Sequence, residues 1–204
     1  MSSMDRKAFL ALTLGAGLVA SSTPLSAGAA DPTEVARVQL VASQPRDATQ
    51  LVERWKMLRG SDMFPFASYA GYLLAYPGFP QEDALRIQAE AALDRDAVPT
   101  EQLIAFFDRY PPLTNSGAAR YALALSAMSR PEASEWAVKA WRGGRMSGPS
   151  EAYIVGTFGA RFSAADHDAR MDALLWQGDA DAAARQLDFV SPQFRPLASA
   201  RARA

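Results

Sequence analysis

The chain has 204 residues, of which 49% are hydrophobic and 21% charged, and its formal net charge is −1. This composition is typical of a folded globular protein, and the charge indicates neither a nucleic-acid partner nor an anionic membrane surface. The chain contains no cysteine and a single histidine, His167. These counts exclude disulfides, thiolate catalysis and multi-histidine metal sites, so any chemistry must rest on carboxylates.

The first 30 residues have the three parts of a secretory signal peptide. Arg6 and Lys7 form the charged start, the uncharged and mostly apolar run 8–20 follows, and small residues at 27–30 offer cleavage sites. The apolar run is shorter than the roughly 20 residues that a membrane-spanning helix needs. We therefore predict that residues 1–30 are removed on export, which leaves a periplasmic protein without a membrane span. The alternatives are an N-terminal membrane anchor and an apolar tail on a cytosolic protein.

The mature chain is predicted to be helical from residue 48 onward. Residues 31–47 are polar and weakly patterned and contain Pro45, so we interpret them as a lead-in before the first helix. After them, apolar residues recur at the three- and four-residue spacing of amphipathic helices. The stripes begin at the following residues: Leu51, Phe66, Leu85, Leu103, Tyr121, Ala133, His167 and Ala180. Residues 153–158 could also form a strand, but no partner strand is visible, so we predict a helix there.

Proline and glycine separate these stripes at intervals of roughly 15–20 residues, which makes the repeating unit a helical hairpin of about 35 residues. Ser163 and Asp166 have the spacing of a helix capping box. Two alanine-rich segments resemble each other and are predicted hairpin turns, in an alignment that pairs Leu125 with Leu175. We expect an all-α superhelix (an α-solenoid) of about nine or ten helices over residues 48–204, tetratricopeptide-like but without the strict tetratricopeptide signature.

The last ten residues, 195–204, begin another alanine-rich helix that no polar capping helix follows. Helical arrays normally end in such a cap. We interpret the scaffold domain as truncated before a further domain. A frayed tail is the alternative interpretation.

Asp166, His167 and Asp168 form the one local cluster with metal-ligand chemistry. Consecutive residues of a helix point about 100° apart, so these three side chains cannot share one face. We therefore predict no metal site here. Asp166 is expected to cap its helix, and His167 to pack on the buried stripe with Met171 and Leu174.

Other candidate sites have a structural interpretation as well. The loop Gly143–Arg145 lacks a phosphate-binding motif. The carboxylates could supply a glycosidase pair, but their usual role is a solvated surface, and the glutamates are expected to stay ionised there. The four tryptophans could be platforms for sugars, but three lie on apolar stripes, which favours packing; the four are Trp55, Trp136, Trp141 and Trp176.

Residues 165–179 resemble a stretch of the soluble lytic transglycosylase family. The shared pattern is Asp-His, then Arg-x-Asp-x-Leu-Leu-Trp-x-Gly, then an alanine-rich helix. Residues 106–112, Phe-Phe-Asp-Arg-Tyr-Pro-Pro, resemble the N-terminal superhelix of that family together with the helix after them, and so does the turn at 190–192. The resemblance covers residues 100–204 well and residues 48–99 loosely.

The resemblance implies an exported protein of peptidoglycan turnover, whose helical region guides glycan strands and cell-wall proteins toward a catalytic domain. In the family, that C-terminal domain cleaves the MurNAc–GlcNAc linkage without hydrolysis, and one glutamate acts as acid and then base. The Glu-Ser-x-Phe, Gly-Leu-Met-Gln and Asn-x-x-x-Gly motifs of that domain are absent here. No catalytic residue is carried over, because serine follows none of the glutamates, which stand at positions 34, 53, 82, 90, 101, 132, 135 and 151.

We therefore expect the N-terminal scaffold of a periplasmic lytic transglycosylase, with no catalytic, cofactor-binding or metal-binding residue of its own. The alternative is a free-standing periplasmic helical-repeat module that binds a protein or peptide. An autonomous enzyme of unknown type is the third interpretation.

Overall fold

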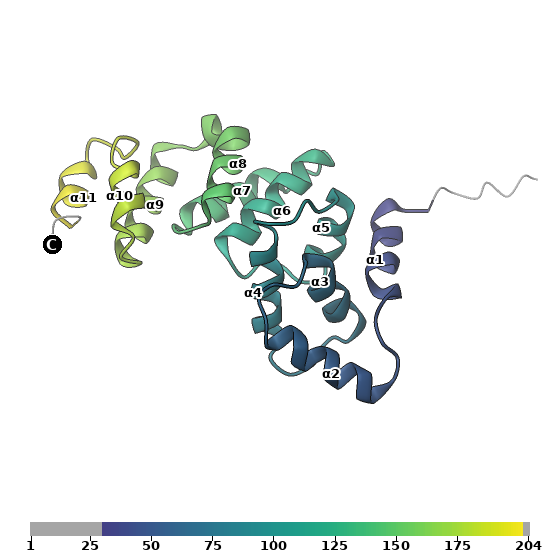
Figure 1. Ribbon diagram of the computed structural model, residues 1–204. Helices are drawn as coiled ribbons and strands as arrows, with labels where there is room; N and C mark the ends of the chain where they lie inside the picture. Colours follow the sequence, from purple (N-terminus) through teal and green to yellow (C-terminus); the bar gives the residue numbers. More distant parts are fainter. Residues whose placement is uncertain (1–29, 202–204) are drawn as a thin grey trace, which may run out of the picture.

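The computed structural model describes residues 30–201, which form eleven α-helices, a short 3-10 helix and no strand (Figure 1). The predicted all-α class is confirmed, whereas the predicted signal peptide lies outside the described residues except for Ala30. No helix in this part of the chain is long and apolar enough to cross a membrane. The helices are α1 (Pro32–Ala42), α2 (Ala48–Arg59), α3 (Phe66–Ala75), α4 (Glu82–Ala92), α5 (Thr100–Phe107), α6 (Asn115–Ala127), α7 (Ala133–Arg142), α8 (Gly148–Phe158), α9 (Ala164–Trp176), α10 (Ala180–Gln186) and α11 (Arg195–Arg201).

The segment 31–47 is more than a lead-in, because it contains α1, which the sequence analysis missed. The Asp31 side chain caps this helix by accepting a hydrogen bond from the Thr33 amide, and Pro32 occupies the first turn, where no amide donor is needed. Ala36 and Leu40 are its two buried residues. This stripe is too short to reveal the helix from periodicity, whereas the ten helices α2–α11 in the described part of residues 48–204 agree with the expected nine or ten.

Glycine at position 71 allows α1 to pack closely on α3. A Cβ atom at Gly71 would collide with the Leu40 carbonyl oxygen and would lie 2.6 Å from Gln44 Nε2. Only a residue without a side chain therefore fits at this contact. The close approach fixes α1 against the rest of the protein.

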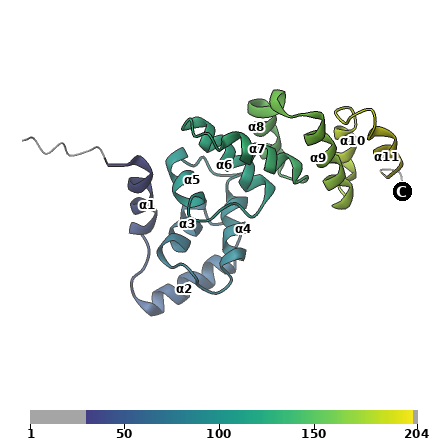
Figure 2. The same ribbon diagram turned by 180° about the vertical axis from the view of Figure 1, so that it is seen from behind.

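The molecule is elongated and bent (Figures 1 and 2): α1 to α5 gather in the N-terminal part, and α6 to α11 then follow one another to the opposite end. Consecutive helices pack as pairs in α3–α4, α6–α7 and α9–α10. The N-terminal part departs from a simple series of pairs, because α1 packs against both α3 and α5. The predicted helix at 153–158 is confirmed as part of α8.

Two of the hairpin turns have the same hydrogen-bond pattern. In the turn after α6, Ser129 adopts a left-handed conformation (φ 55°) and the Arg130 amide donates to the Leu125 carbonyl oxygen at 2.8 Å. The turn after α9 repeats this Schellman motif around Gly178 (φ 65°). The correct alignment therefore pairs Ser129 with Gly178, one residue away from the alignment that the sequence analysis used.

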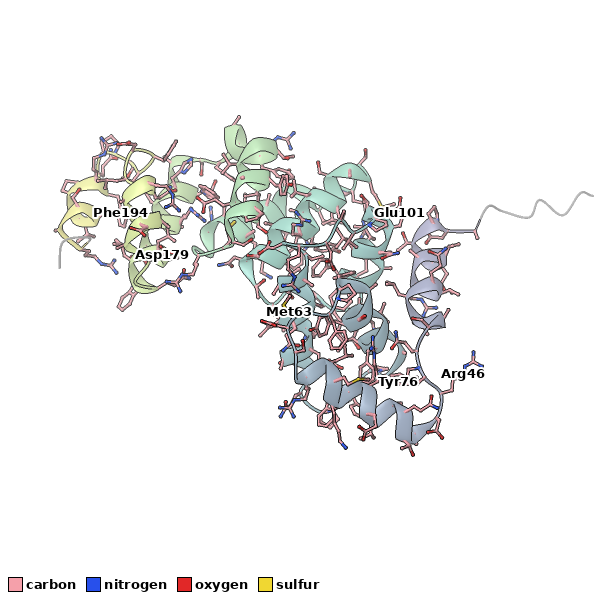
Figure 3. The ribbon with its side chains drawn as sticks, in the orientation of Figure 1. Arg46, Met63, Tyr76, Glu101, Asp179 and Phe194 are labelled. Atoms are coloured by element: carbon pink, nitrogen blue, oxygen red, sulfur yellow. The ribbon has the colours of Figure 1, made fainter. Side chains whose placement is uncertain are left out.

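The apolar side chains form two separate cores. The larger core comprises buried residues from α1 to α8, and Tyr76 packs against it. The smaller core belongs to α9–α11 and the loop after α10, and Phe194 packs against it. Figure 3 places these two labelled side chains in opposite parts of the molecule. Between the cores, the first half of α9 carries the buried polar residues Asp166 and Arg170, and the candidate site lies at this junction.

Candidate functional site

Arg170 is a fully buried cation between the two cores, with an exposed fraction of 1%. Its guanidinium lies 3.0 Å from Glu151 Oε2, donates to the Gly144 carbonyl oxygen at 2.6 Å and stacks 4.0 Å from the centroid of Trp141. Burial lowers the pKa of Arg170, and the Glu151 carboxylate counteracts this effect. The cation is therefore held by one carboxylate, one carbonyl and one aromatic face.

Further ion pairs extend this polar layer, which we call the seam. Arg142 Nε lies 2.5 Å from the buried Asp166 Oδ1, and Arg145 Nε lies 3.0 Å from Asp179 Oδ2. Asp166 also completes the predicted capping box with Ser163, which is confirmed. Burial raises the pKa of Asp166, but hydrogen bonds from Ser163 and the pairing with Arg142 outweigh it, so the net shift is downward. The seam thus joins α7, the α7–α8 loop and α8 to α9 and the start of α10 through charges.

The loop Gly143–Arg145 contributes to the seam through its backbone. Asn115 Nδ2 donates to the Gly143 carbonyl oxygen at 2.7 Å, and the Arg145 amide donates to Gln177 Oε1 at 2.7 Å. Gly144 adopts φ 89°, which a residue with a side chain rarely reaches. Contacts with α6 and α9 therefore fix this loop as a structural connection.

The structure separates the side chains of Asp166, His167 and Asp168, as consecutive helical positions require. Asp168 accepts hydrogen bonds from the Ser191 amide and hydroxyl at 2.8 and 2.7 Å, whereas His167 Nδ1 lies 3.0 Å from Gln186 Nε2. Within residues 30–201, no group of three or more His, Asp or Glu side chains is arranged to hold a metal ion. Asp166 and Asp168 instead stabilise the two ends of the α9–α10 region.

His167 is half-buried beside a cavity, so the prediction that it shares the buried stripe of α9 is wrong. Its ring stacks on Phe189 at 5.5 Å and meets the Trp141 ring edge-on at 5.7 Å. Burial lowers the pKa of His167, and the neighbouring aspartates oppose this only in part. Because Gln186 Nε2 donates to Nδ1, the neutral ring carries its proton on Nε2.

This hollow, which we call the His167 cavity, has a volume of about 340 Å³. Its lining is largely aromatic and aliphatic, with a few polar side chains from α8, α9 and α10. Such a combination is typical of sites for small molecules. The lining residues are Trp141, Glu151, Val155, Gly159, Phe162, His167, Ala182, Arg185, Gln186 and Phe189.

A second and larger hollow of about 800 Å³, which we call the Tyr153 groove, lies between the α4–α5 loop, α6 and α8. The Tyr153 side chain is 55% exposed, and the Arg120 guanidinium lies 5.2 Å from its ring centroid. Arg120 also donates to the Leu93 carbonyl oxygen at 2.9 Å. The groove is lined by residues 93–100 together with Leu103, Arg120, Leu123, Ala124, Pro149 and Tyr153.

Comparison of the chain with protein-family models, with curated proteins and with solved structures finds no match. The resemblance to soluble lytic transglycosylases therefore rests on the residues of the sequence alone.

The residues that carry this resemblance have structural contacts. Asp166 caps α9, Arg170 is buried in the seam, and Asp172 Oδ1 lies 2.5 Å from Arg201 Nη1. Trp176 is 78% exposed beneath the same Arg201. The motif thus joins α9 to its neighbours.

The tryptophans divide as the sequence analysis expected. Trp141 is buried, and Trp55 and Trp136 pack against the larger core. These three are therefore packing residues, as predicted. Trp176, by contrast, lies on the surface.

Glu90 contradicts the expectation that the glutamates are solvated. Its buried carboxylate accepts hydrogen bonds from the Leu113 and Thr114 amides, each at 2.7 Å, and from the Thr114 hydroxyl at 2.5 Å. Burial raises the pKa of Glu90, and these hydrogen bonds lower it in part. The carboxylate holds the chain just before α6, at a point where a Cβ on Gly117 would collide with it.

The sequence analysis missed Arg170 and Glu151, the central ion pair of the seam. The sequence contained one indication of a buried Arg170. This residue stands three residues after His167 and four before Leu174, so it places a charge within an apolar stripe. Its partner Glu151 lies in another helix, and the pairing depends on how α8 and α9 are each placed against α7.

Proposed function

We propose that this chain is a non-catalytic helical scaffold that binds peptidoglycan glycan strands in the periplasm and presents them to a lytic transglycosylase domain. The observation that carries this proposal is the Tyr153 groove, an open hollow of about 800 Å³ with an exposed aromatic ring. Sugars bind proteins by placing a C–H face on an aromatic ring while polar side chains bind their hydroxyl groups. Arg120, Asp94 and Thr100 provide polar groups beside Tyr153 in the groove.

The contacts of the glutamates support binding without cleavage. Glycosidic cleavage needs a carboxyl group with a raised pKa within hydrogen-bond reach of the leaving oxygen. Glu90 has a raised pKa, but its carboxylate already accepts three hydrogen bonds from the segment before α6. Glu151 in turn pairs with the buried Arg170. Both carboxylates therefore stabilise the fold, and in this proposal a separate catalytic domain cleaves the glycan.

The composition of the first 30 residues supports export, because the charged start, the short apolar run and the small residues at 27–30 are those of a signal peptide. The helical hairpins and the motif at residues 165–179 support kinship with the scaffold of lytic transglycosylases. Peptidoglycan is the polymer of the periplasm, so it is a ligand that an exported helical protein with an open polar groove would encounter.

Sedimentation with purified sacculi tests the proposal. The 31–204 chain should co-sediment, and Tyr153→Ala should weaken binding about fivefold, because stacking on one ring contributes roughly 1 kcal/mol. Phe189→Ala is the matched control, since Phe189 is a similarly exposed aromatic residue outside the groove. Equal binding by the Tyr153→Ala variant would contradict a glycan site in the groove.

Two further measurements separate the alternatives. A chito-oligosaccharide should displace the chain from sacculi if the groove binds glycan, whereas a helical-repeat module that binds peptide would not respond to it. No anhydromuropeptide should be released from sacculi by the chain alone. Release above a heat-killed control, abolished by changing one glutamate, would identify an autonomous enzyme.

A further inference from the structure

The His167 cavity has the features of a small-molecule site that is separate from the Tyr153 groove. Its volume of about 340 Å³ lies near the lower end of the range of roughly 300–1,000 Å³ that such sites occupy. Four aromatic rings line it, and two of them, Trp141 and Phe162, stack on each other at 4.8 Å with an interplanar angle of 12°. Because Phe162 and the Arg170 guanidinium cover the faces of Trp141, these rings form a rigid apolar wall, and the exposed Phe189 offers a ligand the open aromatic surface.

Two buried hydrogen-bond donors near the cavity lack an acceptor within the described part of the chain but are not open to a ligand. Trp141 is only 4% exposed, and its indole Nε1 has no hydrogen-bond partner among the described residues. Arg170 Nε, on the guanidinium that stacks against Trp141, is likewise buried without a partner in residues 30–201. Buried donors are normally satisfied. Neither N–H group has accessible surface and Arg170 does not line the cavity, so the polar group of a ligand must be bound by other side chains of the cavity wall.

The charges around the cavity favour an anionic oxygen. Arg170 and Arg185 approach the same Glu151 oxygen, at 3.0 and 3.9 Å, so two cations face one carboxylate. Arg170 makes the short contact and is fully buried, whereas the Arg185 side chain is 63% exposed at the cavity mouth. Asp179 also lies near both arginines, but Arg185 makes only the long contact to Glu151, and its exposed guanidinium fork is well suited to bind a carboxylate.

We propose that the His167 cavity binds a small aromatic carboxylic acid, whose ring packs among Trp141, Phe162 and Phe189 and whose carboxylate is bound by Arg185. The apolar lining selects the ring, and the Arg185 guanidinium selects the acid over its neutral analogues. The site is independent of the glycan-binding proposal, because it shares no residue with the Tyr153 groove.

Titrations monitored by ¹H–¹⁵N NMR test this inference on the chain. The probes are indole-3-acetate, its neutral analogue indole-3-acetamide, and acetate, which has the charge without the ring. Indole-3-acetate should shift the assigned Trp141 indole N–H resonance in a saturable way. Indole-3-acetamide should bind at least about tenfold more weakly, and acetate should cause no saturable shift.

Two arginine variants provide the matched comparison. Arg185→Gln should weaken indole-3-acetate binding at least about tenfold. Arg161→Gln should leave the affinity unchanged, because Arg161 is an exposed arginine that stacks on Phe158 and does not line the cavity. A thermal melt of each variant verifies that it is folded. The proposal is overturned if indole-3-acetate gives no saturable shift, if the amide binds equally well, or if both variants bind like the unaltered chain.

Discussion

The surroundings of the His167 ring determine its pKa and thereby make the stability of the protein depend on pH. Burial keeps the pKa of His167 below its ordinary value of 6.5, since the charged ring is poorly solvated beside Phe189 and Trp141. The unfolded chain therefore takes up this proton at a higher pH than the folded chain does. The stabilising contribution of the neutral ring is complete above pH 6.5 and is lost as the pH falls below that value.

We expect the His167→Gln variant to lack this acid-dependent loss. In urea unfolding at pH 8, 7, 6 and 5, the stability of the unaltered chain relative to the variant should decrease toward the lower pH values. Other titrating groups are common to both proteins and cancel in the difference. A difference that stays constant with pH would show that His167 is not held in its neutral form.

Arg170 shows what the sequence could not reveal at the scale of residues. Its position on the apolar stripe of α9 was visible, but a charged residue there is normally assigned to the surface. The compensation comes from Glu151, Gly144 and Trp141, which belong to other segments and meet Arg170 only after the helices have packed. The His167 cavity was unpredictable for the same reason, because its wall combines residues from separate segments.

At the scale of elements, the helices themselves were largely predictable. The apolar stripes from Leu51 to Ala180 each mark an observed helix, and proline and glycine mark the turns. The helix α1 was not predicted because its buried face consists only of Ala36 and Leu40. Its place in the fold depends on contact with α3 and α5, which no local pattern encodes.

Two helical glycines should respond oppositely to alanine. Gly71→Ala places a methyl group against the Leu40 carbonyl oxygen, so it should reduce the free energy of unfolding by about 2–4 kcal/mol. Gly156→Ala is the control in α8, where nothing lies within 4 Å of the added Cβ. That variant should gain about 0.5–1 kcal/mol from helix propensity. Chemical denaturation measures both, and a neutral Gly71→Ala would contradict the close α1–α3 contact.

The hairpin turns permit a second comparison between matched variants. Ser129→Gly should stabilise the protein by about 0.5–1 kcal/mol, because Ser129 holds the left-handed conformation that Gly178 adopts in the equivalent turn. Ser134→Gly, at an exposed position within α7, should destabilise it by about 0.5–1 kcal/mol. Thermal or urea unfolding distinguishes the two signs. Destabilisation by Ser129→Gly would reject the alignment of the two turns.

At the scale of the whole molecule, the seam divides the protein into two apolar cores held together by ion pairs. Glu151→Gln should leave Arg170 buried without its counter-ion and reduce the free energy of unfolding by about 2–4 kcal/mol. Glu132→Gln, which removes an exposed partner of Arg130, should cost less than about 0.5 kcal/mol. Hydrogen exchange should show faster opening of α9–α11 than of α3–α6 in the Glu151→Gln variant. Uniform acceleration over all helices would mean that the two cores unfold as one.

The location of the His167 cavity also couples ligand binding to molecular shape. Trp141 and Phe162 belong to the larger core, whereas Ala182 belongs to the smaller one. A molecule in the cavity therefore touches both parts and has its highest affinity for one mutual orientation of them. A force or partner that turns the C-terminal helices away from this orientation therefore lowers the affinity for the bound molecule. By thermodynamic linkage, the bound molecule makes that turn less favourable by the same free energy.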